Sequence, residues 1–350
     1  MILSGPGDQM GRRSTEQLEA EAKLFAHAAQ VLDVHHLLLS DELRNRTFFE
    51  ALKSVVTPKS AVLDIGSGSG VWAITAAMLG AQRVVAIERD VILIGLIRRL
   101  AYDNGVADRV EVINGDSREV QLDRDFDVVV SETIGNVIFE EQIVPIMADA
   151  RERFLKPGGS LIPRRVTLLA APASYPQPAR LPVGTSGSFE YFNSLALNSP
   201  LALLQKDQVR FVGEAKTLVD VDLASIAGSL DLTNLTATWR IENVSPINCF
   251  VVWANIELTD EISISTFDST SWSIMIYRIE SFERQSGELE FTLSLTSETN
   301  YWNTRFVSGD SQEVRTYSPA KAATELVVLG RTDAKVLNHL QQIGLLGHTI

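Results

Sequence analysis

The chain has a single cysteine, Cys249, and five histidines, none of which lies between His36 and His339. One cysteine excludes an internal disulfide framework and any metal site built from a cysteine cluster, and we expect no metal. The chain also lacks a run of about 18 apolar residues that could cross a membrane. Its first residues, MILSGPGDQMGRRSTEQ, lack the apolar stretch of a signal peptide. These absences favour a cytoplasmic protein that is not attached to a membrane.

Positive charge is also scarce. The chain has 31 Lys and Arg against 44 Asp and Glu, which gives a net charge of −13 and a pI near 4.9. Direct binding to a nucleic acid is therefore not expected, because it needs clustered cationic side chains. An acidic field would raise the local concentration of a cationic substrate. The same charge also serves solubility, so it does not by itself identify a ligand.

The pattern of apolar residues divides the chain into an α/β part and a β part. Residues 14–55 read as helical, because apolar residues recur at spacings of three and four without Gly or Pro. Short runs rich in Val and Ile then alternate with helical stretches, which describes a doubly wound parallel sheet. The runs are 61–65, 83–88, 109–114 and 126–132, and the helical stretches are about 71–80, 91–104 and 140–155.

From about Arg164 the chain contains runs that are rich in Thr and Val and show the alternation of a strand, as in residues 236–243, 250–258 and 288–296. No comparable helices separate these runs, so we expect antiparallel β structure, a sandwich or a barrel. Residues 175–206 differ: they open rich in Pro and Gly and then become apolar. We expect this segment to leave the β domain rather than to join its sheet.

A glycine-rich loop follows the first strand, in the sequence VLDIGSGSG over residues 62–70. Gly66, Gly68 and Gly70 permit a tight turn and a close approach of a ligand, and the next helix offers unpaired N–H donors. A dinucleotide would fit this layout, but Asp64 before the first glycine would repel its pyrophosphate. An acid there suits the amino group and the sulfonium of S-adenosylmethionine, which is the cofactor we expect.

Acidic residues also end the second and third strands. Glu88 is placed to accept hydrogen bonds from both hydroxyls of a ribose. Asp116, followed by Ser117, is placed where the exocyclic amine of an adenine could be held. Because the carboxyl ends of parallel strands meet at one edge of a sheet, we expect these residues and the glycine loop to form one cofactor site.

Two further carboxylates follow the fourth strand, in the sequence SETIGNVIFEE over residues 131–141. Glu132 leaves the strand end and Glu141 follows nine residues later, so both are expected at the ligand-binding edge of the sheet. There they could bind a cation between them. Alternatively, Glu132 caps the following segment, and Glu140 and Glu141 begin a helix whose dipole favours acids. For Glu140 we favour this alternative.

These motifs resemble those of the protein arginine methyltransferases, a family of class I S-adenosylmethionine-dependent methyltransferases. The resemblance covers nearly the whole chain after about residue 30. The glycine loop is similar to the first motif of the family. The segment SETIGNVIFEE resembles its double-E hairpin, with Glu132 and Glu141 at the two glutamates.

Other segments extend the resemblance. SDELRNRT (40–47) resembles the N-terminal helix segment of the family, which implies that Arg44 holds the carboxylate of the cofactor. His35 and Asp41 also fall on family positions, as a cofactor contact and as a catalytic residue. Residues 254–272 resemble the barrel segment that leads into the Thr-His-Trp loop of the family.

The resemblance implies a fold in three parts: an N-terminal helical lid (1–50), a Rossmann-like S-adenosylmethionine-binding domain (51–163) and a C-terminal antiparallel β-barrel (164–350). The segment at about 175–206 would be the arm that makes a homodimer.

The chain departs from the family at three places. The Thr-His-Trp loop reads Thr270-Ser271-Trp272, and serine cannot act as a cation near neutral pH. Ser271 therefore receives no role, and Trp272 is expected to pack in the β core. The aromatic motif expected near residues 25–33 is absent, and Thr133 and Ile134 stand where the family usually has Trp and Met.

The paired glutamates suit a guanidinium, which is planar and always protonated and offers five N–H donors. Two carboxylates could orient one terminal nitrogen toward a sulfonium methyl group. The substrate is then an arginine in a protein, or free arginine or another small guanidino compound. Two alternatives stay open: methylation of another amine or a hydroxyl, and a catalytically silent cofactor-binding dimer partner.

Overall fold

The structure is a computed structural model of the 350-residue chain, and it describes residues 15–176, 195–242, 246–282, 286–296 and 300–320. The chain begins with two helices, α1 (Thr15–Leu39) and α2 (Glu42–Val55). The helical prediction for residues 14–55 thus corresponds to two helices with a break between them. The break lies at Asp41, whose extended backbone and side-chain carboxylate cap the N-terminus of α2.

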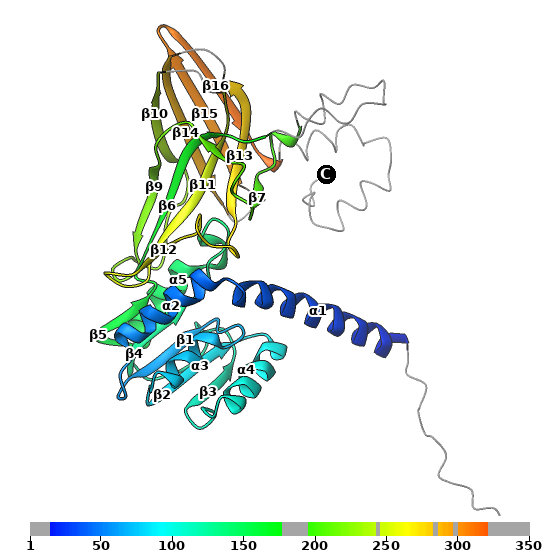
Figure 1. The fold of residues 1–350 in the computed structure, drawn as a ribbon, viewed down its shortest axis with the longest axis vertical. Coiled ribbons are helices and arrows are strands. Elements are labelled where there is room, and N and C mark those ends of the chain that lie inside the picture. The colour runs from blue at the N-terminus through cyan, green and yellow to red at the C-terminus, as the bar shows by residue number, and fades with distance from the viewer. Residues whose placement is uncertain (1–14, 177–194, 243–245, 283–285, 297–299, 321–350) are drawn as a thin grey trace, which may run out of the picture.

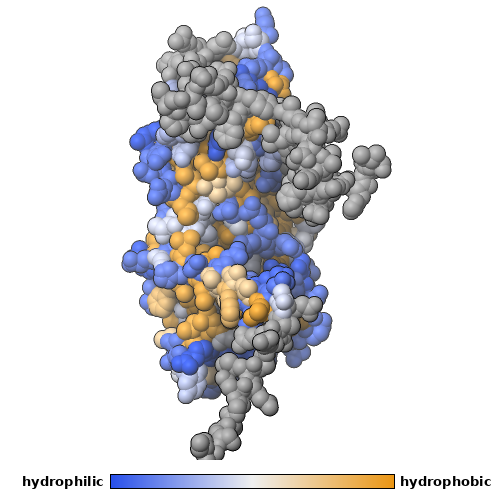
Figure 2. Space-filling model, turned by 90° about the vertical axis from the view of Figure 1, so that its right-hand side faces the viewer, coloured by the Kyte–Doolittle hydropathy of each residue, from blue (hydrophilic) through white to orange (hydrophobic). Residues whose placement is uncertain are grey.

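Helix α1 extends away from the rest of the molecule, as Figure 1 shows. Several of its apolar side chains are exposed: Leu18, Leu24, Phe25, Leu32, Val34, Leu37 and Leu39. Figure 2 shows the side of the molecule toward which α1 points, where hydrophobic surface gathers across the middle and lower parts. None of the helices in the described residues is long and apolar enough to cross a membrane.

The α/β part contains a five-stranded sheet in the order β3-β2-β1-β4-β5, in which every pair is parallel. Its strands are almost wholly buried apolar runs because helices cover the sheet. The strands are β1 (Ala61–Ile65), β2 (Arg83–Glu88), β3 (Val110–Asn114), β4 (Phe126–Ser131) and β5 (Leu155–Ile162). The helices are α3 (Val71–Met78), α4 (Val91–Asp103) and α5 (Ile143–Arg153), with a short 3-10 turn η1 (Phe139–Glu141) before α5.

The strand order reverses between β1 and β4, which are hydrogen-bonded neighbours. The glycine loop follows β1, and the segment with Glu132 follows β4. Ligands bind in open α/β sheets outside the carboxyl ends of the strands at such a reversal point. The topology therefore brings the two predicted sites to the same place.

The β part forms two antiparallel sheets. The four-stranded sheet has the order β10-β14-β15-β16, and the larger sheet has the order β7-β13-β11-β6-β8, with β12 paired to β11 and β9 to β6. Their bounds are β6 (Arg165–Ser174), β7 (Leu201–Leu203), β8 (Arg210–Phe211), β9 (Lys216–Asp222), β10 (Leu235–Ile241), β11 (Ile247–Glu257), β12 (Ser263–Ser265), β13 (Ile274–Phe282), β14 (Gly287–Leu295), β15 (Asn300–Ser308) and β16 (Ser311–Tyr317).

This architecture confirms the predicted fold class: a helical N-terminus, a Rossmann-like core and an antiparallel β domain. Between the two β sheets, no ladder of hydrogen bonds joins the strands that the structure describes, so these strands do not close into a single barrel. One expectation is corrected. Residues 201–203 form the edge strand β7 and pair with β13, although the segment 175–206 was expected to stand outside the sheet. Residues 177–194 of that segment lie outside the described residues.

The α/β and β parts share one hydrophobic core. A single cluster of buried side chains runs from Phe48 of α2 and Trp72 of α3 to Trp272 and Trp302 of the β domain. Strand β5 was not expected, because its sequence contains Pro157-Gly158-Gly159 and reads as a turn. It nevertheless pairs with β4 and carries the chain into β6. The shared core fixes the loop before β13 against the edge of the parallel sheet.

Candidate active site

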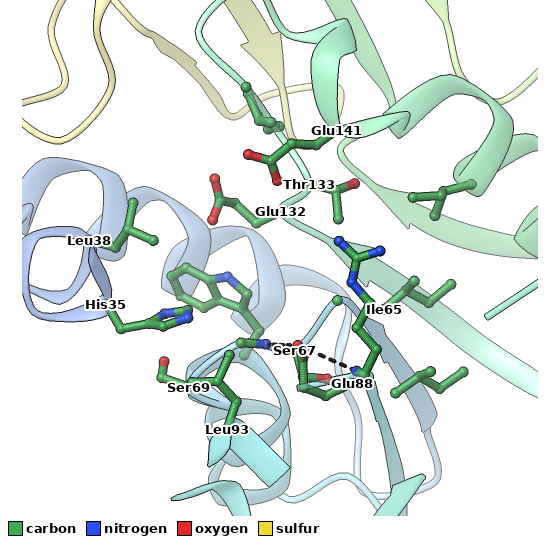
Figure 3. A pocket seen from close by; sticks show the side chains of 18 of the residues that line it. His35, Leu38, Ile65, Ser67, Ser69, Glu88, Leu93, Glu132, Thr133 and Glu141 are labelled. Atoms are coloured by element: carbon green, nitrogen blue, oxygen red, sulfur yellow. Dashed lines mark hydrogen bonds between the residues drawn. The ribbon is translucent and has the colours of Figure 1, made fainter. Parts of the chain in front are cut away.

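A cavity of about 870 Å³ lies at the carboxyl edge of the parallel sheet. Its wall combines the end of α1, the glycine loop, the ends of β2 and β3, the segment after β4, and Trp272 from the β domain. Figure 3 shows this cavity, with His35, Ser67 and Glu88 on one side and Glu132 and Glu141 on the other. The cavity brings together most of the residues that the sequence singled out.

The glycine loop needs glycine at all three positions. Gly66, Gly68 and Gly70 have φ angles of +65°, +56° and +79°, a region that other residues rarely adopt. A Cβ atom on Gly68 would also stand 2.5 Å from Cε1 of His35, because the end of α1 packs directly over the loop. Gly66 and Gly68 line the cavity, whereas Gly70 begins α3 and does not. His35 lines it as well, and burial lowers the pKa of its imidazole.

Glu88 ends β2 with its carboxylate held by backbone donors. Oε2 accepts a hydrogen bond from the N–H of Gly68 at 2.8 Å, and Oε1 accepts from Arg89 and Asp90 at 2.8 and 2.9 Å. The side chain is buried and lines the cavity beside the glycine loop. The carboxylate is therefore fixed in the place where the sequence predicts a ribose.

Asp64 lies beneath the glycine loop rather than in the cavity wall. It is fully buried, and its Oδ2 accepts a hydrogen bond from the N–H of Ala73 at 3.0 Å. Burial raises the pKa of its carboxyl group to about 7. Its Oδ1 atom has no partner among the described residues, which leaves one acceptor available to a ligand or a water.

Asp116 and Ser117 line the cavity at the end of β3. The carboxylate of Asp116 is already paired with Arg118, whose Nη2 and Nε atoms lie 2.7 and 3.0 Å from its two oxygens. Hydrogen bonds from Arg118 lower the pKa of Asp116 to about 2. An amine that binds to Asp116 must therefore share this carboxylate with Arg118.

Glu132 is the most constrained carboxylate in the cavity. One oxygen, Oε2, forms a close ion pair with the guanidinium of Arg44 from α2. The other, Oε1, accepts a hydrogen bond from the indole Nε1 of Trp272 at 3.1 Å. The Glu132 and Arg44 side chains are only 10% and 2% exposed. Burial raises the pKa of Glu132, and the Arg44 guanidinium opposes this shift.

Three aromatic rings surround the Arg44 guanidinium. Its central carbon lies 5.8, 5.5 and 5.4 Å from the ring centroids of Phe48, Trp72 and Trp272. Arg44 also donates to Oδ1 of Asn45 at 2.9 Å, but its buried Nε atom has no partner among the described residues. A ligand carboxylate is a suitable partner for that donor.

Glu141 faces the cavity from the other side of the hairpin and is exposed there. Figure 3 shows its carboxylate next to that of Glu132. Partial burial in the cavity wall and the neighbouring Glu140 raise its pKa. The hairpin contains two non-glycine residues with positive φ, Ile138 at 70° and Gln142 at 65°. Such backbone strain costs about 1–3 kcal/mol per residue and is typical of functional sites.

Glu140 does not begin a helix, contrary to the alternative that we favoured for it. It lies in the turn η1, two residues before Gln142 and three before the start of α5 at Ile143. Its Oε2 accepts a hydrogen bond from the N–H of Val137 at 3.4 Å, which closes the hairpin. Glu140 therefore supports the position of Glu141.

Asp41 does not line the cavity, although it was predicted to be catalytic. It is 1% exposed and binds the loop before β13. Its Oδ2 accepts hydrogen bonds from the hydroxyls of Ser269 and Ser271 at 2.5 and 2.8 Å, and from the N–H groups of Thr270 and Ser271 at 2.9 and 3.0 Å. These hydrogen bonds lower its pKa to about 2, although burial opposes them.

Comparison with known proteins places this geometry in a family. Residues 46–163 match the family model of ribosomal protein L11 methyltransferase. The chain is 33% identical over 263 residues to the arginine N(omega)-methyltransferase of Streptomyces achromogenes subsp. streptozoticus, covering 71% of this chain and 72% of that protein. The chain belongs to the protein arginine methyltransferase family.

Plant relatives agree with this assignment. The chain is 25% identical over 272 residues to the probable protein arginine N-methyltransferase 6 of Arabidopsis thaliana. The match covers 71% of this chain and 60% of that protein, so the chain spans less than two thirds of the length of this relative.

Solved structures share the fold. The chain resembles the Trypanosoma brucei PRMT1 enzyme-prozyme heterotetrameric complex with AdoHcy, with a TM-score of 0.71 at 18% identity, over 81% of this chain and 97% of that one. It also resembles Arabidopsis thaliana protein arginine methyltransferase 10, with a TM-score of 0.68 at 20% identity, over the same shares. These likenesses support the fold, and the 33% identity to the Streptomyces protein confirms the resemblance to the family that the sequence motifs indicated.

Sequence reasoning missed two features of this site. Trp272 packs in the core as expected, but its indole N–H also donates to Glu132 and its ring faces Arg44, which the sequence did not predict. Ser269 and Ser271 received no role, yet they bind Asp41. The sequence contained one signal for the serines: Ser271 replaces the histidine of the family loop, so the contacts of that histidine must be made in another way or be lost.

Proposed function

We propose that this protein transfers the methyl group of S-adenosylmethionine to a guanidino nitrogen of arginine. The observation that carries this proposal is the state of Glu132. Its carboxylate already binds a guanidinium, that of Arg44, and it lies beside Glu141 in the wall of the cavity above the glycine loop. Arg44 can neutralise only one of the two carboxylates, so together they retain negative charge and free acceptors for a second guanidinium.

The residues around the cavity fit the cofactor. Arg44 has an unpartnered Nε donor for a carboxylate, and Asp64 has an unpartnered acceptor beneath the glycine loop. Glu88 would accept the ribose hydroxyls, Gly66 and Gly68 would let the cofactor approach the backbone, and Gly70 would begin the helix behind it. His35 would cover the loop, and Asp116 with Ser117 would contact the adenine. Bound there, S-adenosylmethionine supplies a methyl group on a positively charged sulfur.

Glu132 and Glu141 would orient the substrate. A carboxylate can accept about four hydrogen bonds, so Glu132 can bind a substrate nitrogen while it keeps Arg44 and Trp272. Glu141 would bind the other edge of the guanidinium. Together they would fix one terminal nitrogen for attack on the methyl group and draw positive charge toward the other nitrogens. The N–C bond would form as the bond between the methyl group and the sulfur breaks, which leaves a neutral thioether. The proton would then pass from that nitrogen, whose pKa has fallen, to solvent.

We favour free L-arginine as the substrate, with arginine in a protein as the second form. The relative from Streptomyces, at 33% identity, is named for arginine itself, whereas the plant relative at 25% is named for protein arginine. Thr133 and Ile134, which line the cavity, stand where the family usually has Trp and Met, so Thr133 replaces a much larger side chain. This difference affects whether free arginine or an arginine in a protein fits the cavity, but it does not change the proposed contacts of the guanidinium.

The test uses the purified chain, labelled S-adenosylmethionine, and two substrates assayed side by side: L-arginine and a mixture of arginine-rich peptides. We expect a methyl group on a guanidino nitrogen of L-arginine, located by mass spectrometry. Methylation of the peptides alone would show that the substrate is arginine in a protein rather than free arginine. Cofactor binding with no methylation of either would contradict it and would favour another acceptor or a silent cofactor-binding protein.

We further propose that the chain divides into a lid (1–50), a cofactor domain (51–163) and a β domain (164–350), and that it acts as a cytoplasmic homodimer. The exposed apolar side chains of α1 support an association of this kind, because large exposed apolar patches mark interaction sites. The segment at about 175–206 is the proposed dimer arm. Light scattering on the purified chain, with and without residues 177–194, tests the dimer.

A further inference from the structure

The contacts around Glu132 form a closed ring. Glu132 binds Arg44, the backbone N–H of Arg44 binds Asp41, and Asp41 binds Ser269. Ser269 binds the backbone of Trp272, whose indole N–H returns to Glu132. We propose that Ser269 is a positioning residue for the methyl transfer, because it orients Arg44 and Trp272, the two partners of Glu132. Ser271 and Lys206 support it in this role. The proposal depends on the proposed function only for its activity measurement.

Ser269 occupies the centre of this ring. Its hydroxyl donates to Oδ2 of Asp41 at 2.5 Å and accepts hydrogen bonds from the N–H groups of Ser271 and Trp272 at 3.2 and 2.9 Å. The side chain is 2% exposed and lies outside the cavity. One hydroxyl therefore fixes the start of α2, from which Arg44 extends, and the turn that carries Trp272.

Lys206 supports the same loop from the other side. Its ammonium group donates to the carbonyl oxygens of Thr266 and Ser269, both at 2.5 Å. Burial lowers the pKa of Lys206, while the charges of Asp41 and Asp268 raise it. The partly buried ammonium group of Lys206 therefore binds the same loop that donates hydrogen bonds to the buried carboxylate of Asp41. Lys206 lies three residues after the end of β7, so it connects this edge of the large sheet to the loop before β13.

The hydrogen bonds between Asp41 and the loop residues Ser269 and Ser271 should not depend on pH near neutrality. All the donors to the Asp41 carboxylate are uncharged hydroxyl and N–H groups, and its pKa is about 2. Among the charged residues nearby, Lys206 interacts electrostatically with Asp41 and with Asp268, and Arg44 binds Asp41 only through its backbone N–H. Because its pKa in the folded state lies below the ordinary value of about 3.9, its stabilising effect is present above that pH and is lost only as the pH falls toward 2.

The first experiment compares Ser269→Ala with Ser269→Thr, which keeps the hydroxyl. We expect Ser269→Ala to lower kcat by roughly tenfold or more, because a hydrogen bond to a charged group is lost. KM for the guanidino substrate should change much less, and Ser269→Thr should restore most of kcat. Thr270→Ala is the matched control, since Thr270 is exposed and contributes only its backbone N–H to Asp41.

The second experiment replaces Ser271 with His, because an imidazole next to Asp41 would introduce a titration. The ratio of Ser271→His activity to wild-type activity should change with pH above about 6.5, the ordinary pKa of histidine, since the carboxylate stabilises the imidazolium. Lys206→Met should lower kcat in the same direction as Ser269→Ala. An unchanged kcat in folded Ser269→Ala, Ser271→Ala and Lys206→Met would overturn the proposal.

A separate measurement keeps this proposal distinct from the proposed function. If the wild-type chain methylates no guanidino substrate, the orientation of Arg44 and Trp272 can still be read from cofactor affinity and from tryptophan fluorescence. We then expect Ser269→Ala to weaken S-adenosylmethionine binding severalfold and to change the fluorescence, with Thr270→Ala unchanged. Wild-type affinity and fluorescence in folded Ser269→Ala would contradict the positioning role.

Discussion

The two walls of the cavity are built in different ways. The wall formed by the glycine loop and Glu88 comes from the ends of two neighbouring strands, and backbone groups hold it. The wall formed by Arg44, Glu132 and Trp272 depends on side chains that are 88 and 140 residues apart in the chain. The first wall is a local motif, whereas the second exists only when α2, the parallel sheet and the β domain are assembled. Substitutions should therefore affect the two walls differently.

The largest effect is expected for Glu132→Gln. This change removes the charge that binds Arg44 and, in the proposed function, the substrate. Methylation should fall by roughly a hundredfold or more. The free energy of unfolding should fall by about 3 kcal/mol, because a buried guanidinium loses its partner. Steady-state kinetics and chemical denaturation measure the two effects, and wild-type activity in the variant would contradict the assigned role.

Glu141→Gln, in the same wall, should lower methylation without lowering the stability of the protein. Glu141 makes no ion pair among the described residues and is exposed to the cavity, so its loss should leave the melting temperature nearly unchanged. Methylation should still fall by roughly a hundredfold. Glu119→Gln is the matched control, because Glu119 is exposed and does not line the cavity, and its effect on kcat/KM should be much smaller. Equal losses in the two variants would remove the special role of Glu141.

Gly68→Ala should disrupt the local wall. A side chain there would meet His35 at 2.5 Å, and the φ of +56° would cost about 1–2 kcal/mol. We expect the Kd for S-adenosylmethionine to rise tenfold or more by calorimetry. Gly105→Ala is the control, because Gly105 has a φ of +68° but no atom within 4 Å of the added Cβ. It should lower stability and leave cofactor affinity unchanged.

Trp272→Phe should weaken the assembled wall without removing a charge. The ring next to Arg44 is kept, but the indole donor to Glu132 is lost. We expect kcat to fall roughly tenfold, since a hydrogen bond to a charged group contributes about 1.5–3 kcal/mol. Trp239→Phe loses an indole hydrogen bond to the backbone of Glu214, far from the cavity, and should leave kcat unchanged. Similar kcat losses in both would contradict the prediction.

The smallest effect concerns Asp64 and pH. Its pKa of about 7 lies above the ordinary value, so between about pH 4 and 7 the folded chain binds more protons than the unfolded chain. Stability of the cofactor-free protein should therefore fall as the pH rises through this range, by about 2 kcal/mol from pH 5.5 to 7.5. Denaturation at both pH values measures it. Asp64→Asn should reduce the difference, and an unchanged difference would contradict the assignment.

The sequence predicted the local wall well because each of its residues lies in a short pattern that specifies its own backbone. The glycines at 66, 68 and 70 have the positive φ angles that the pattern requires, and Glu88 ends its strand as expected. The break at Asp41 also had a local signal, since an acid after Ser40 is a common helix cap. Strand β5 was missed because Pro and Gly are rare inside strands.

The assembled wall was predicted only in part, because sequence patterns do not contain the contacts that complete it. Glu132 and Glu141 were found from their placement after β4. Ser269 and Asp41 are 228 residues apart, and nothing in either segment indicates that they bind one another. The role of Trp272 was missed for the same reason, since a buried tryptophan near a β strand usually packs in the core.

The most direct test is calorimetric titration of L-arginine and L-citrulline into the chain saturated with S-adenosylhomocysteine. Citrulline has nearly the same shape as arginine but no positive charge. If Glu132 and Glu141 bind a guanidinium, arginine should bind at least tenfold more tightly than citrulline, and Glu141→Gln should lose this preference. Equal binding of the two ligands, or an undiminished preference for arginine in Glu141→Gln, would contradict the role assigned to the paired carboxylates.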